Sequence, residues 1–307
     1  MITRAAMAAL YTPIYDDFML EVYSEETQVH PQAFESVEDK TKDRDYHGIS
    51  GLGMWVDATE AEGGGYEDPA LGYPKTFTPG KFWKKFQVSF EAVDQDEYAL
   101  LKRQDEAKNM GRGARAKVEN DTANVLNTGF TVAGPDGQFL FDIDHPKNPE
   151  ETSIVYDNLL TGAFSHDNLE AAEAQMAANF FDPTGLPIPL IQKPLILYPS
   201  TIKGKVLRVL AERAAGEQPD TTLRNTNIYA GQYTPVCWRY LDAVLGGSNT
   251  AWYIVFPELG YFKIIWGAKP SFSAWVDEDL ELYKFKGRMI YDCGYINWRG
   301  AFGSTGL

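Results

Sequence analysis

The chain has 307 residues, 44% of them hydrophobic, which is enough apolar material for one large domain or two ordinary domains with a buried core. Its 43 Asp and Glu residues outnumber its 28 Lys and Arg residues, and the first 100 residues hold 19 of the acidic but only 8 of the basic side chains. Because no basic stripe stands out, the composition argues against tight, sequence-specific binding of DNA or RNA. No apolar run reaches the roughly 20 residues of a membrane span, so no membrane partner is expected.

Residues 1–45 are predicted to form an extended arm. Pro13, Pro31 and a dense cluster of charges from Glu35 to Asp45 interrupt any helical periodicity. The alternative interpretation of this segment is a frayed terminus.

Residues 46–95 are predicted to form a long two-stranded excursion. Apolar side chains alternate with other residues at 52–58 and again at 86–90, which is the period of a β-strand. The stretch between them is rich in Gly, Pro and aromatic residues. This stretch would be a loop of about 25 residues, which is uncommon inside a compact domain. Exposed aromatic residues in such a loop are typical of a surface that is buried on a partner.

The segment 97–127 is predicted to be a single long helix. Apolar and small residues recur at steps of three and four, and Gly129 can end the helix. At 1.5 Å per residue such a helix reaches about 45 Å, well beyond the usual length. Its narrow stripe of apolar and small residues, including Ala107, Gly111 and Ala114, predicts a spine that lies across a sheet.

The rest of the chain is predicted to mix strands and helices, which gives an α+β fold. A helix is expected from near Asp167, where Asp167 and Glu170 would form a capping box, and its buried side is expected to consist of Leu169, Ala172, Met176 and Phe180. The remaining predicted elements are strands flanking a turn within 131–141, a strand at 194–198, a helix at 200–215, a hairpin of 251–256 with 261–266, and two strands around Lys286-Gly287 within 280–298.

One cluster could carry metal chemistry. Asp142, Asp144 and His145 combine carboxylate and imidazole ligands, which can hold a divalent ion. The alternative interpretation is a solvated strand end before Pro146, because on a strand His145 points away from the two carboxylates.

No other motif indicates an enzyme or a cofactor site. Ser165, His166 and Asp167 are adjacent in sequence and so cannot take up the geometry of a catalytic triad. No phosphate-binding or dinucleotide-binding glycine motif occurs, and two cysteines make no disulfide framework. Three lysines around Phe82 and Trp83 form a small basic and aromatic patch that could stack on nucleic acid, but the acidic residues around it favour a protein partner.

The order of elements and three motifs carry a resemblance to a known family. The motifs are GPDGQFLFDIDHP at 134–146, PLILYPSTIKGKVLRVL at 194–210, and the segment 225–257 that ends in TAWYIVFP. Together with the arm, the long loop and the spine helix, they resemble the Hong Kong 97-type major capsid protein of tailed phages, and in particular the Mu-like major head proteins.

The resemblance implies a structural protein without an active site or a cofactor. Such a protein would assemble in the host cytoplasm into hexamers and pentamers that form the icosahedral head of the virion around double-stranded DNA. The implied parts are an N-terminal arm (1–45), an extended loop (46–95), a peripheral domain (96–129 and 271–307) and an axial domain (130–270).

The resemblance also implies contacts between subunits and with other proteins. The candidate contact residues are Trp55, Tyr66, Tyr73, Phe77, Phe82, Trp83, Lys84 and Lys85. The expected partners are copies of the chain itself, a separate scaffolding protein, a portal protein and decoration proteins. Contact with packaged DNA is expected to be non-specific.

Two alternative functions remain open at this point. The first is an encapsulin-like compartment shell, which shares the fold but encloses protein. The second is a metal-dependent hydrolase that uses Asp142, Asp144 and His145.

Overall fold

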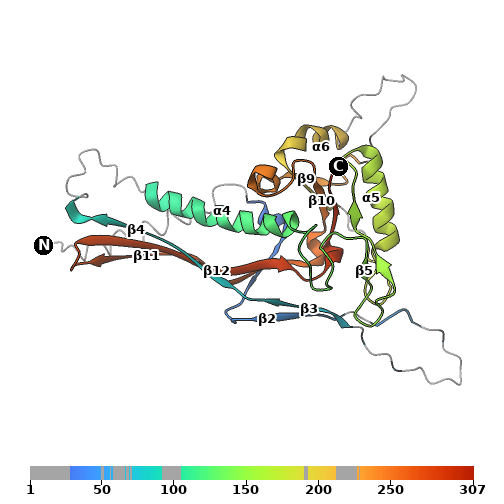
Figure 1. The fold of residues 1–307 in the computed structure, drawn as a ribbon, viewed down its shortest axis with the longest axis horizontal. Helices are drawn as coiled ribbons and strands as arrows, with labels where there is room; N and C mark the ends of the chain where they lie inside the picture. Colours follow the sequence, from blue (N-terminus) through green and yellow to red (C-terminus); the bar gives the residue numbers. More distant parts are fainter. Residues whose placement is uncertain are drawn as a thin grey trace.

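The structure is a computed structural model of the whole chain, and it describes residues 28–49, 52–55, 57, 66, 69, 71–91, 105–189, 193–211, 227 and 229–307. These residues form an elongated part and a compact body (Figure 1). Each part is built around its own sheet.

The elongated part is a four-stranded sheet with one long helix along it. The strands lie in the order β1-β11-β12-β4. The long strands β11 (Phe262–Asp277) and β12 (Leu282–Tyr295) form an antiparallel hairpin, with β4 (Gly80–Ser89) antiparallel to β12 and the short β1 (Glu35–Glu38) parallel to β11. The helix α4 (Asp105–Asn127) runs alongside this sheet.

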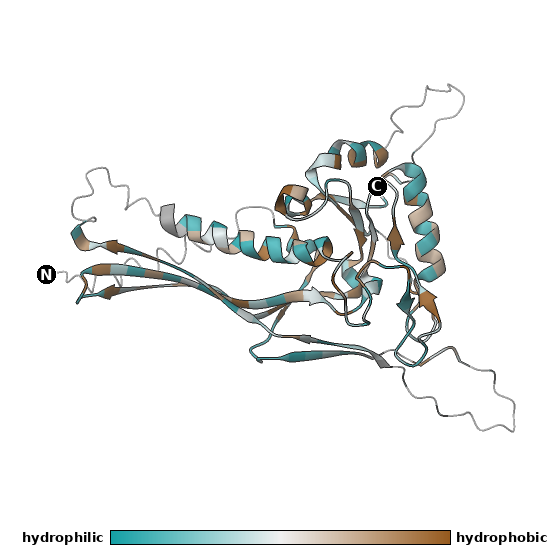
Figure 2. Cartoon of the chain, viewed as in Figure 1, coloured by the Kyte–Doolittle hydropathy of each residue, from teal (hydrophilic) through white to brown (hydrophobic). Residues whose placement is uncertain are grey.

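The compact body contains a five-stranded sheet in the order β7-β13-β10-β8-β9. Its central strands β13 (Ala301–Ser304), β10 (Trp252–Val255) and β8 (Leu195–Tyr198) are buried along their whole length. The outer strands are β7 (Leu159–Leu160) and β9 (Thr234–Cys237), and the helices α5 (His166–Asn179) and α6 (Lys203–Val209) belong to the same body. Figure 2 shows the apolar character of the body strands against the more hydrophilic α5.

Short elements complete the described chain. The helix α2 (His30–Ala33) precedes β1, and β2 (Arg44–Ile49) pairs with β3 (Leu71–Phe77) in a separate antiparallel hairpin. A two-stranded ribbon joins β5 (His145–Pro146) to β6 (Val155–Tyr156). No helix in the described ranges combines the length and the hydropathy that crossing a membrane requires.

Several predicted elements are confirmed. The spine helix ends at Asn127 as predicted, while the predicted segment 97–104 lies outside the described residues. The helix α5 buries the expected Leu169, Ala172 and Met176, although Ser165 caps it by accepting a hydrogen bond from the Asn168 N–H at 3.2 Å. The strand at 194–198 is present as β8.

Of the two strands predicted in the segment 46–95, one is present and the other is not. The strand at 86–90 is present but longer, as β4. The predicted strand at 52–58 is wrong for residues 52–55 and 57, which lie in irregular structure, and β2 and β3 form the hairpin instead. Of the alternating apolar residues that the structure describes here, Leu52 and Met54 are exposed, so they do not pack on the subunit as a strand face would.

Near the end of the sequence, strands are present at both halves of the predicted hairpin 251–266, but their predicted pairing is wrong, and so are the two strands predicted within 280–298. β10 and β11 belong to different sheets, since the chain turns through a short 3₁₀ helix at Pro257–Leu259 and crosses from the body to the elongated part. The segment 280–298 holds one long strand, β12, that passes straight through Gly287. Gly287 suits a close approach instead of a turn, because a Cβ there would lie 2.6 Å from Sδ of Met110 on α4.

The other expected elements are shorter than predicted. The helix at 200–215 is a 3₁₀ turn at Ser200–Ile202 followed by α6, which ends at Val209, and residues 212–215 lie outside the described residues. The strands at 131–141 reduce to a single bridge between Ala133 and Phe139.

Candidate assembly surfaces

Asp142, Asp144 and His145 do not converge on one point. The Asp142 carboxylate accepts a hydrogen bond from the Ile143 N–H at 2.8 Å, and Asp144 is exposed. In the part of the chain that the structure describes, no three His, Cys, Asp or Glu side chains are grouped to hold a metal ion. The predicted ligand set therefore has no geometry that supports metal chemistry.

The solvated strand end predicted for His145 is wrong, because His145 is fully buried. Its Nδ1 atom lies 2.7 Å from Oδ2 of Asp136, and its Nε2 atom lies 3.1 Å from Oδ1 of Asn158. Its ring stacks on Trp298, with centroids 4.3 Å apart. His145 thus joins the 134–146 segment to the body core as a structural residue.

The end of the arm is fastened to the spine helix by a buried carboxylate. Oε1 of Glu119 accepts hydrogen bonds from the Val29 N–H at 2.9 Å and the His30 N–H at 3.3 Å, and lies 2.7 Å from Nδ1 of His30. These contacts fix the position of Val29 and His30 against α4. Residues 1–27 of the predicted arm lie outside the described residues.

The described residues between β2 and β3 expose large apolar side chains. Trp55 is 98% exposed, Tyr66 is fully exposed, and Leu52 and Met54 are exposed as well. Large apolar side chains gathered in this way on a surface mark an interaction site. The structure thus places the predicted contacts Trp55 and Tyr66 on the surface.

Tyr73 and Phe77 lie on the hairpin strand β3, nearer to the subunit interior. Tyr73 is half-buried, and burial together with the negative charge of Asp136 raises its pKa. Phe77 has no exposed surface and packs edge-on against Tyr46. Phe77 is therefore a core residue of the subunit in this structure, and its side chain offers no surface to a neighbour.

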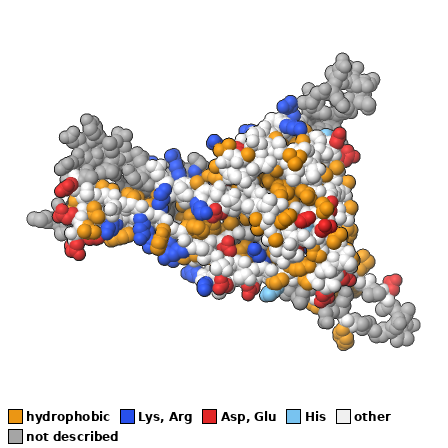
Figure 3. All heavy atoms as spheres, viewed as in Figure 1, with side chains coloured by type: hydrophobic (Ala, Val, Ile, Leu, Met, Phe, Trp, Pro, Cys, Tyr) orange, Lys and Arg blue, Asp and Glu red, His pale blue; other side chains and the backbone are white. Residues whose placement is uncertain are grey.

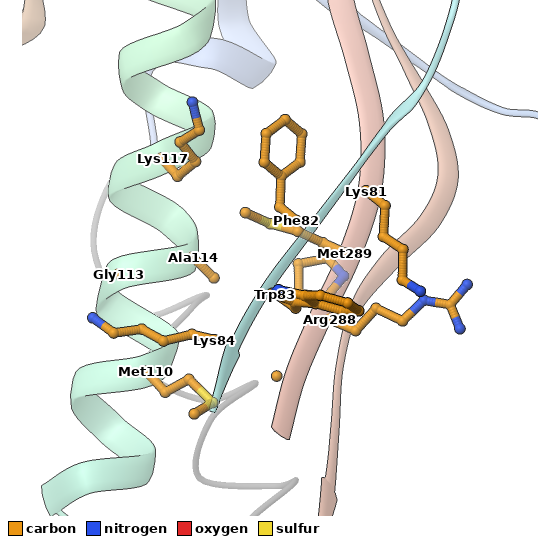
Figure 4. Close-up of a pocket in the computed structure, with 12 residues that line it drawn as sticks. Lys81, Phe82, Trp83, Lys84, Met110, Gly113, Ala114, Lys117, Arg288 and Met289 are labelled. Atoms are coloured by element: carbon orange, nitrogen blue, oxygen red, sulfur yellow. The ribbon is translucent and has the colours of Figure 1, made fainter. Parts of the chain in front are cut away.

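The sheet of the elongated part has an inner face that packs on α4. Phe82 of β4 lies on this face, 4.9 Å from Tyr291 between ring centroids, with Lys117 of α4 over its ring. Tyr291 donates a hydrogen bond to Oδ2 of Asp121 at 2.7 Å, which ties β12 to the helix. Figure 4 shows Phe82 and Met289 pointing toward α4.

The opposite face of this sheet carries cations around an exposed tryptophan. Alternation along β4 and β12 brings Lys81, Trp83, Lys85, Lys286 and Arg288 to this face, which we call the basic face. Trp83 is 58% exposed, and the ammonium groups of Lys81, Lys85 and Lys286 lie 4.7, 4.8 and 5.5 Å from its ring centroid. Figure 3 shows Lys and Arg side chains gathered over the elongated part, and Figure 4 shows Lys81, Trp83 and Arg288 directed away from α4.

A groove of about 400 Å³ opens between α4 and the β4 edge of the sheet. Phe82, Met110, Ala114 and Met289 contribute apolar walls, and Lys84 and Lys117 lie at its margin. Lys84, another predicted contact, is exposed here and faces α4 instead of the basic face. The groove therefore continues the cationic surface around the free edge of β4.

Sequence reasoning missed two exposed features. Lys286 and Arg288 join the basic face only because β12 pairs with β4, and that pairing spans about 200 residues of sequence. Val244, in a short 3₁₀ helix of the body, is 91% exposed beside the exposed Leu245. A run of apolar residues before Gly246-Gly247 was the one available signal for this second feature.

The described fold and surfaces define a class of protein. The described residues form an elongated sheet with a spine helix, a second sheet in a compact body, and exposed aromatic side chains between β2 and β3. This architecture is typical of a subunit that assembles into a shell. The "Phage capsid protein" family model matches residues 72–303, well over half of the chain. The chain belongs to this phage capsid protein family, and it is a structural subunit of the virion capsid.

Solved structures share the Hong Kong 97-type fold at low sequence identity. The capsid of cyanophage P-SCSP1u aligns with a TM-score of 0.61 at 10% identity, over 91% of this chain and 88% of that chain. The procapsid of bacteriophage JBD30 aligns with a TM-score of 0.52 at 16% identity, over 99% and 76% of the two chains. A virus-like particle from Pyrococcus furiosus aligns with a TM-score of 0.54 at 10% identity, over 96% and 99%. No curated protein sequence matches the chain.

Proposed function

We propose that the head subunit assembles into hexamers and pentamers that enclose double-stranded DNA, with the part of the segment 46–95 that lies between β2 and β3 contacting a neighbouring subunit. The observation that carries this proposal is the set of large apolar side chains exposed between β2 and β3. Trp55 and Tyr66 have almost no contact within their own subunit, so a neighbour is needed to bury them. Tyr73, Trp83, Lys84 and Lys85 are the other proposed contacts.

The domain assignment is also a proposal, and the strand order supports a refined version of it. The sequence-based prediction places 96–129 and 271–307 in a peripheral domain, which corresponds to the elongated part, and 130–270 in an axial domain, which corresponds to the body. β11 begins at Phe262 within the elongated sheet, whereas β13 lies in the body sheet. We therefore assign 262–295 to the peripheral domain and 296–307 to the axial domain.

Two finer assignments rest on the motifs and on the acidic charge. The motifs between Gly134 and Pro257 support a place among the Mu-like major head proteins. A scaffolding protein, a portal protein and decoration proteins are the proposed further partners. The charge of −15 supports a non-specific and weak contact with the packaged DNA, because like charge keeps a polyanion from adhering to the shell.

The family assignment favours the phage head over the compartment-shell alternative, and the separation of Asp142, Asp144 and His145 removes the ligand set of the hydrolase alternative. Electron microscopy of the expressed full chain, with and without its phage's scaffolding protein, tests the proposal. Rings of five and six subunits or closed shells are expected. A subunit that stays monomeric under both conditions at high concentration would contradict the proposal.

A further inference from the structure

Beyond β1, the strand β11 is an edge strand of the elongated sheet. Among the described strands only β1 pairs with this side of β11, and it reaches from Lys263 to Trp266. On its other side, β11 pairs with β12 in unbroken register from Ser271 to Asp277. We call the segment 271–277 the β11 edge. An edge of this kind presents a row of N–H and C=O groups, which is a template for a strand of another chain.

The protection that is usual for an edge strand stops short of the β11 edge. Register shifts lie on either side of Ala268, and Pro270 has no N–H to donate. The sequence from 271 to 277 is SFSAWVD, and its one charged residue, Asp277, is paired with Lys284 of β12. The opposite edge strand, β4, carries three lysines, which are a common protection against unwanted pairing. The two edges of this sheet therefore differ, and β4 is guarded by charge whereas the β11 edge is not.

Side chains alternate along the β11 edge between the two sides of the sheet. The odd-numbered positions share the side of the basic face, where Trp275 keeps 42% of its surface exposed. The even-numbered positions share the other side, where Phe272 and Ala274 belong to the apolar cluster around Met110 of α4. A strand added at this edge would therefore cover part of Trp275 on one side and extend an apolar cluster on the other.

The β11 edge is complementary to itself when two copies of it run antiparallel. In the register centred on Ala274, the cross-strand pairs are Ser271 with Asp277, Phe272 with Val276, and Ser273 with Trp275. Aromatic residues opposite β-branched residues stabilise an antiparallel pair, whereas like charges directly opposite each other destabilise it. This register places Phe272 opposite Val276 twice and places no two charges opposite each other.

We propose that the β11 edge pairs antiparallel with the β11 edge of a second copy of this chain. This inference rests on the proposed function, because it specifies one contact between neighbouring head subunits. The contact is isologous, since both copies use the same segment, and its two-fold axis passes beside Ala274. The four strands of each elongated sheet would then join into one continuous sheet across the two copies.

A second copy fits this edge better than a different protein does. One contact covers the free edge of both copies at once, and the segment supplies its own complementary side chains. The hairpin of β11 and β12 reaches the end of the elongated part that lies farthest from the body, where a second copy can approach it (Figure 1). An isologous contact closes after two copies, so it can join one ring of subunits to the next without starting a filament.

A disulfide tests the register. Directly opposite Cα atoms of an antiparallel pair lie about 4.5–5.5 Å apart, within the range of about 4.4–6.8 Å that a disulfide spans. Ala274→Cys is therefore expected to give covalent dimers when assembled particles are mildly oxidised. Ser271→Cys is the matched control on the same strand, because the two copies of position 271 would lie about 20 Å apart along the strands. At least about tenfold more dimer is expected from Ala274→Cys on a non-reducing gel.

Charge substitutions test whether assembly needs the contact. Ser273→Glu with Trp275→Glu places two carboxylates opposite each other twice across the contact, while within the subunit they lie opposite Lys286 and Lys284. This variant is expected to lower the fraction of subunits in particles at least about tenfold, because like charges across an interface oppose association. Ser273→Glu with Trp275→Lys lacks the same tryptophan but sets opposite charges against each other, and it is expected to restore particles.

Further controls separate folding and total charge from assembly. Asn109→Glu with Gln232→Glu adds as much negative charge at two other exposed positions and is expected to assemble as the wild type does. The unfolding midpoint of each unassembled variant, measured by circular dichroism, is expected to stay close to that of the wild type. The wild type, which retains Cys237 and Cys293, gives the background of covalent dimer.

Three results would overturn the inference. The first is that Ala274→Cys gives no more dimer in particles than Ser271→Cys does. The second is that Ser273→Glu with Trp275→Glu assembles as the wild type does. The third is that the thiol introduced at position 274 is shielded from maleimide in particles yet forms no dimer, which would assign the edge to a different segment or protein. Wild-type shells in these cases would leave the proposed head function intact, whereas a wild type that forms no capsomer would count against that function and this contact together.

Discussion

Nδ1 of His145 lies 2.7 Å from Oδ2 of Asp136 in a site that is closed to solvent. The other ring nitrogen faces the amide oxygen of Asn158, whose own NH₂ group donates to the carbonyls of Leu140 and Ala301. Both ring nitrogens therefore lie within hydrogen-bond distance of an oxygen atom, so both polar edges of the buried imidazole are held in place. This buried pair links the 134–146 segment to β13.

Asp136→Asn is expected to destabilise the subunit by about 1–3 kcal/mol, because the buried His145 ring loses the carboxylate that its Nδ1 atom contacts. Asp144→Asn is the matched control, since Asp144 is exposed and its loss is expected to change stability by less than about 0.5 kcal/mol. Urea unfolding of the unassembled subunit gives both values. Equal stability of the two variants would show that the Asp136 and His145 pair contributes nothing.

Glu119→Ala is expected to release the end of the arm from the spine helix. The substitution removes the acceptor of two backbone N–H groups and of the His30 ring, with an expected loss of about 1–3 kcal/mol for the unsatisfied groups. Hydrogen exchange is expected to rise at Val29 and His30 while the body strands stay protected. Glu170→Ala, on the exposed side of α5, is the control and is expected to leave that exchange unchanged.

Gly303→Ala is expected to damage the body more than Gly287→Ala damages the elongated part. A Cβ at Gly303 would lie 2.6 Å from the ring of Phe141, which is buried among other aromatic side chains and cannot move aside. A Cβ at Gly287 would meet Sδ of Met110, which is part of a flexible side chain. We expect losses of about 1–3 kcal/mol for Gly303→Ala and less than about 1 kcal/mol for Gly287→Ala, measured as shifts of the urea midpoint.

Cys293 is expected to resist thiol reagents in the folded subunit. Burial, followed by the negative charges of Asp121 and Asp292, raises the pKa of Cys293 to about 12. At pH 8 a thiol with that pKa is ionised in about one molecule in ten thousand, and the thiolate is the reactive form. Maleimide labelling followed by mass spectrometry is expected to modify Cys293 only after denaturation, and rapid labelling of the native subunit would contradict this.

The same thiol contributes to a loss of stability in alkali. In the unfolded chain a cysteine ionises near pH 8.5, whereas Cys293 in the folded subunit ionises near pH 12. Between these values the unfolded state binds fewer protons, so the contribution of Cys293 to stability falls as pH rises through this window. Cys293→Ser is expected to show a weaker decline than the wild type when the urea midpoint is measured from pH 8 to pH 10.

Periodicity and apolar runs in the sequence were sufficient to predict single helices and strands. The end of α4, the buried side of α5 and the strand β8 could be predicted, because periodicity and apolar runs report directly on which side is buried. The hairpin expected at 251–266 failed because nothing local tells whether two consecutive strands pair with each other or enter different sheets.

Among the candidate contact residues, some could be placed from neighbouring residues in the sequence, whereas others depend on long-range strand pairing. Lys81, Trp83 and Lys85 share one side of a strand by alternation alone, whereas the participation of Lys286 and Arg288 depends on long-range pairing with β12. The burial of His145 was likewise unpredictable, since its partner Asp136 lies in a turn whose direction depends on the body core. Exposed aromatic residues in the loop were the strongest sequence signal for a protein that builds assemblies.

The position of β13 has a consequence for synthesis of the head. β13 lies between β7 and β10, although it is the last of the five body strands to be translated. Until residues 301–304 have been made, β7 has no partner in that sheet and β10 keeps an open edge. The five-stranded sheet of the body can therefore be completed only after residues 301–304 have been synthesised, so the body cannot finish folding strand by strand as the chain emerges.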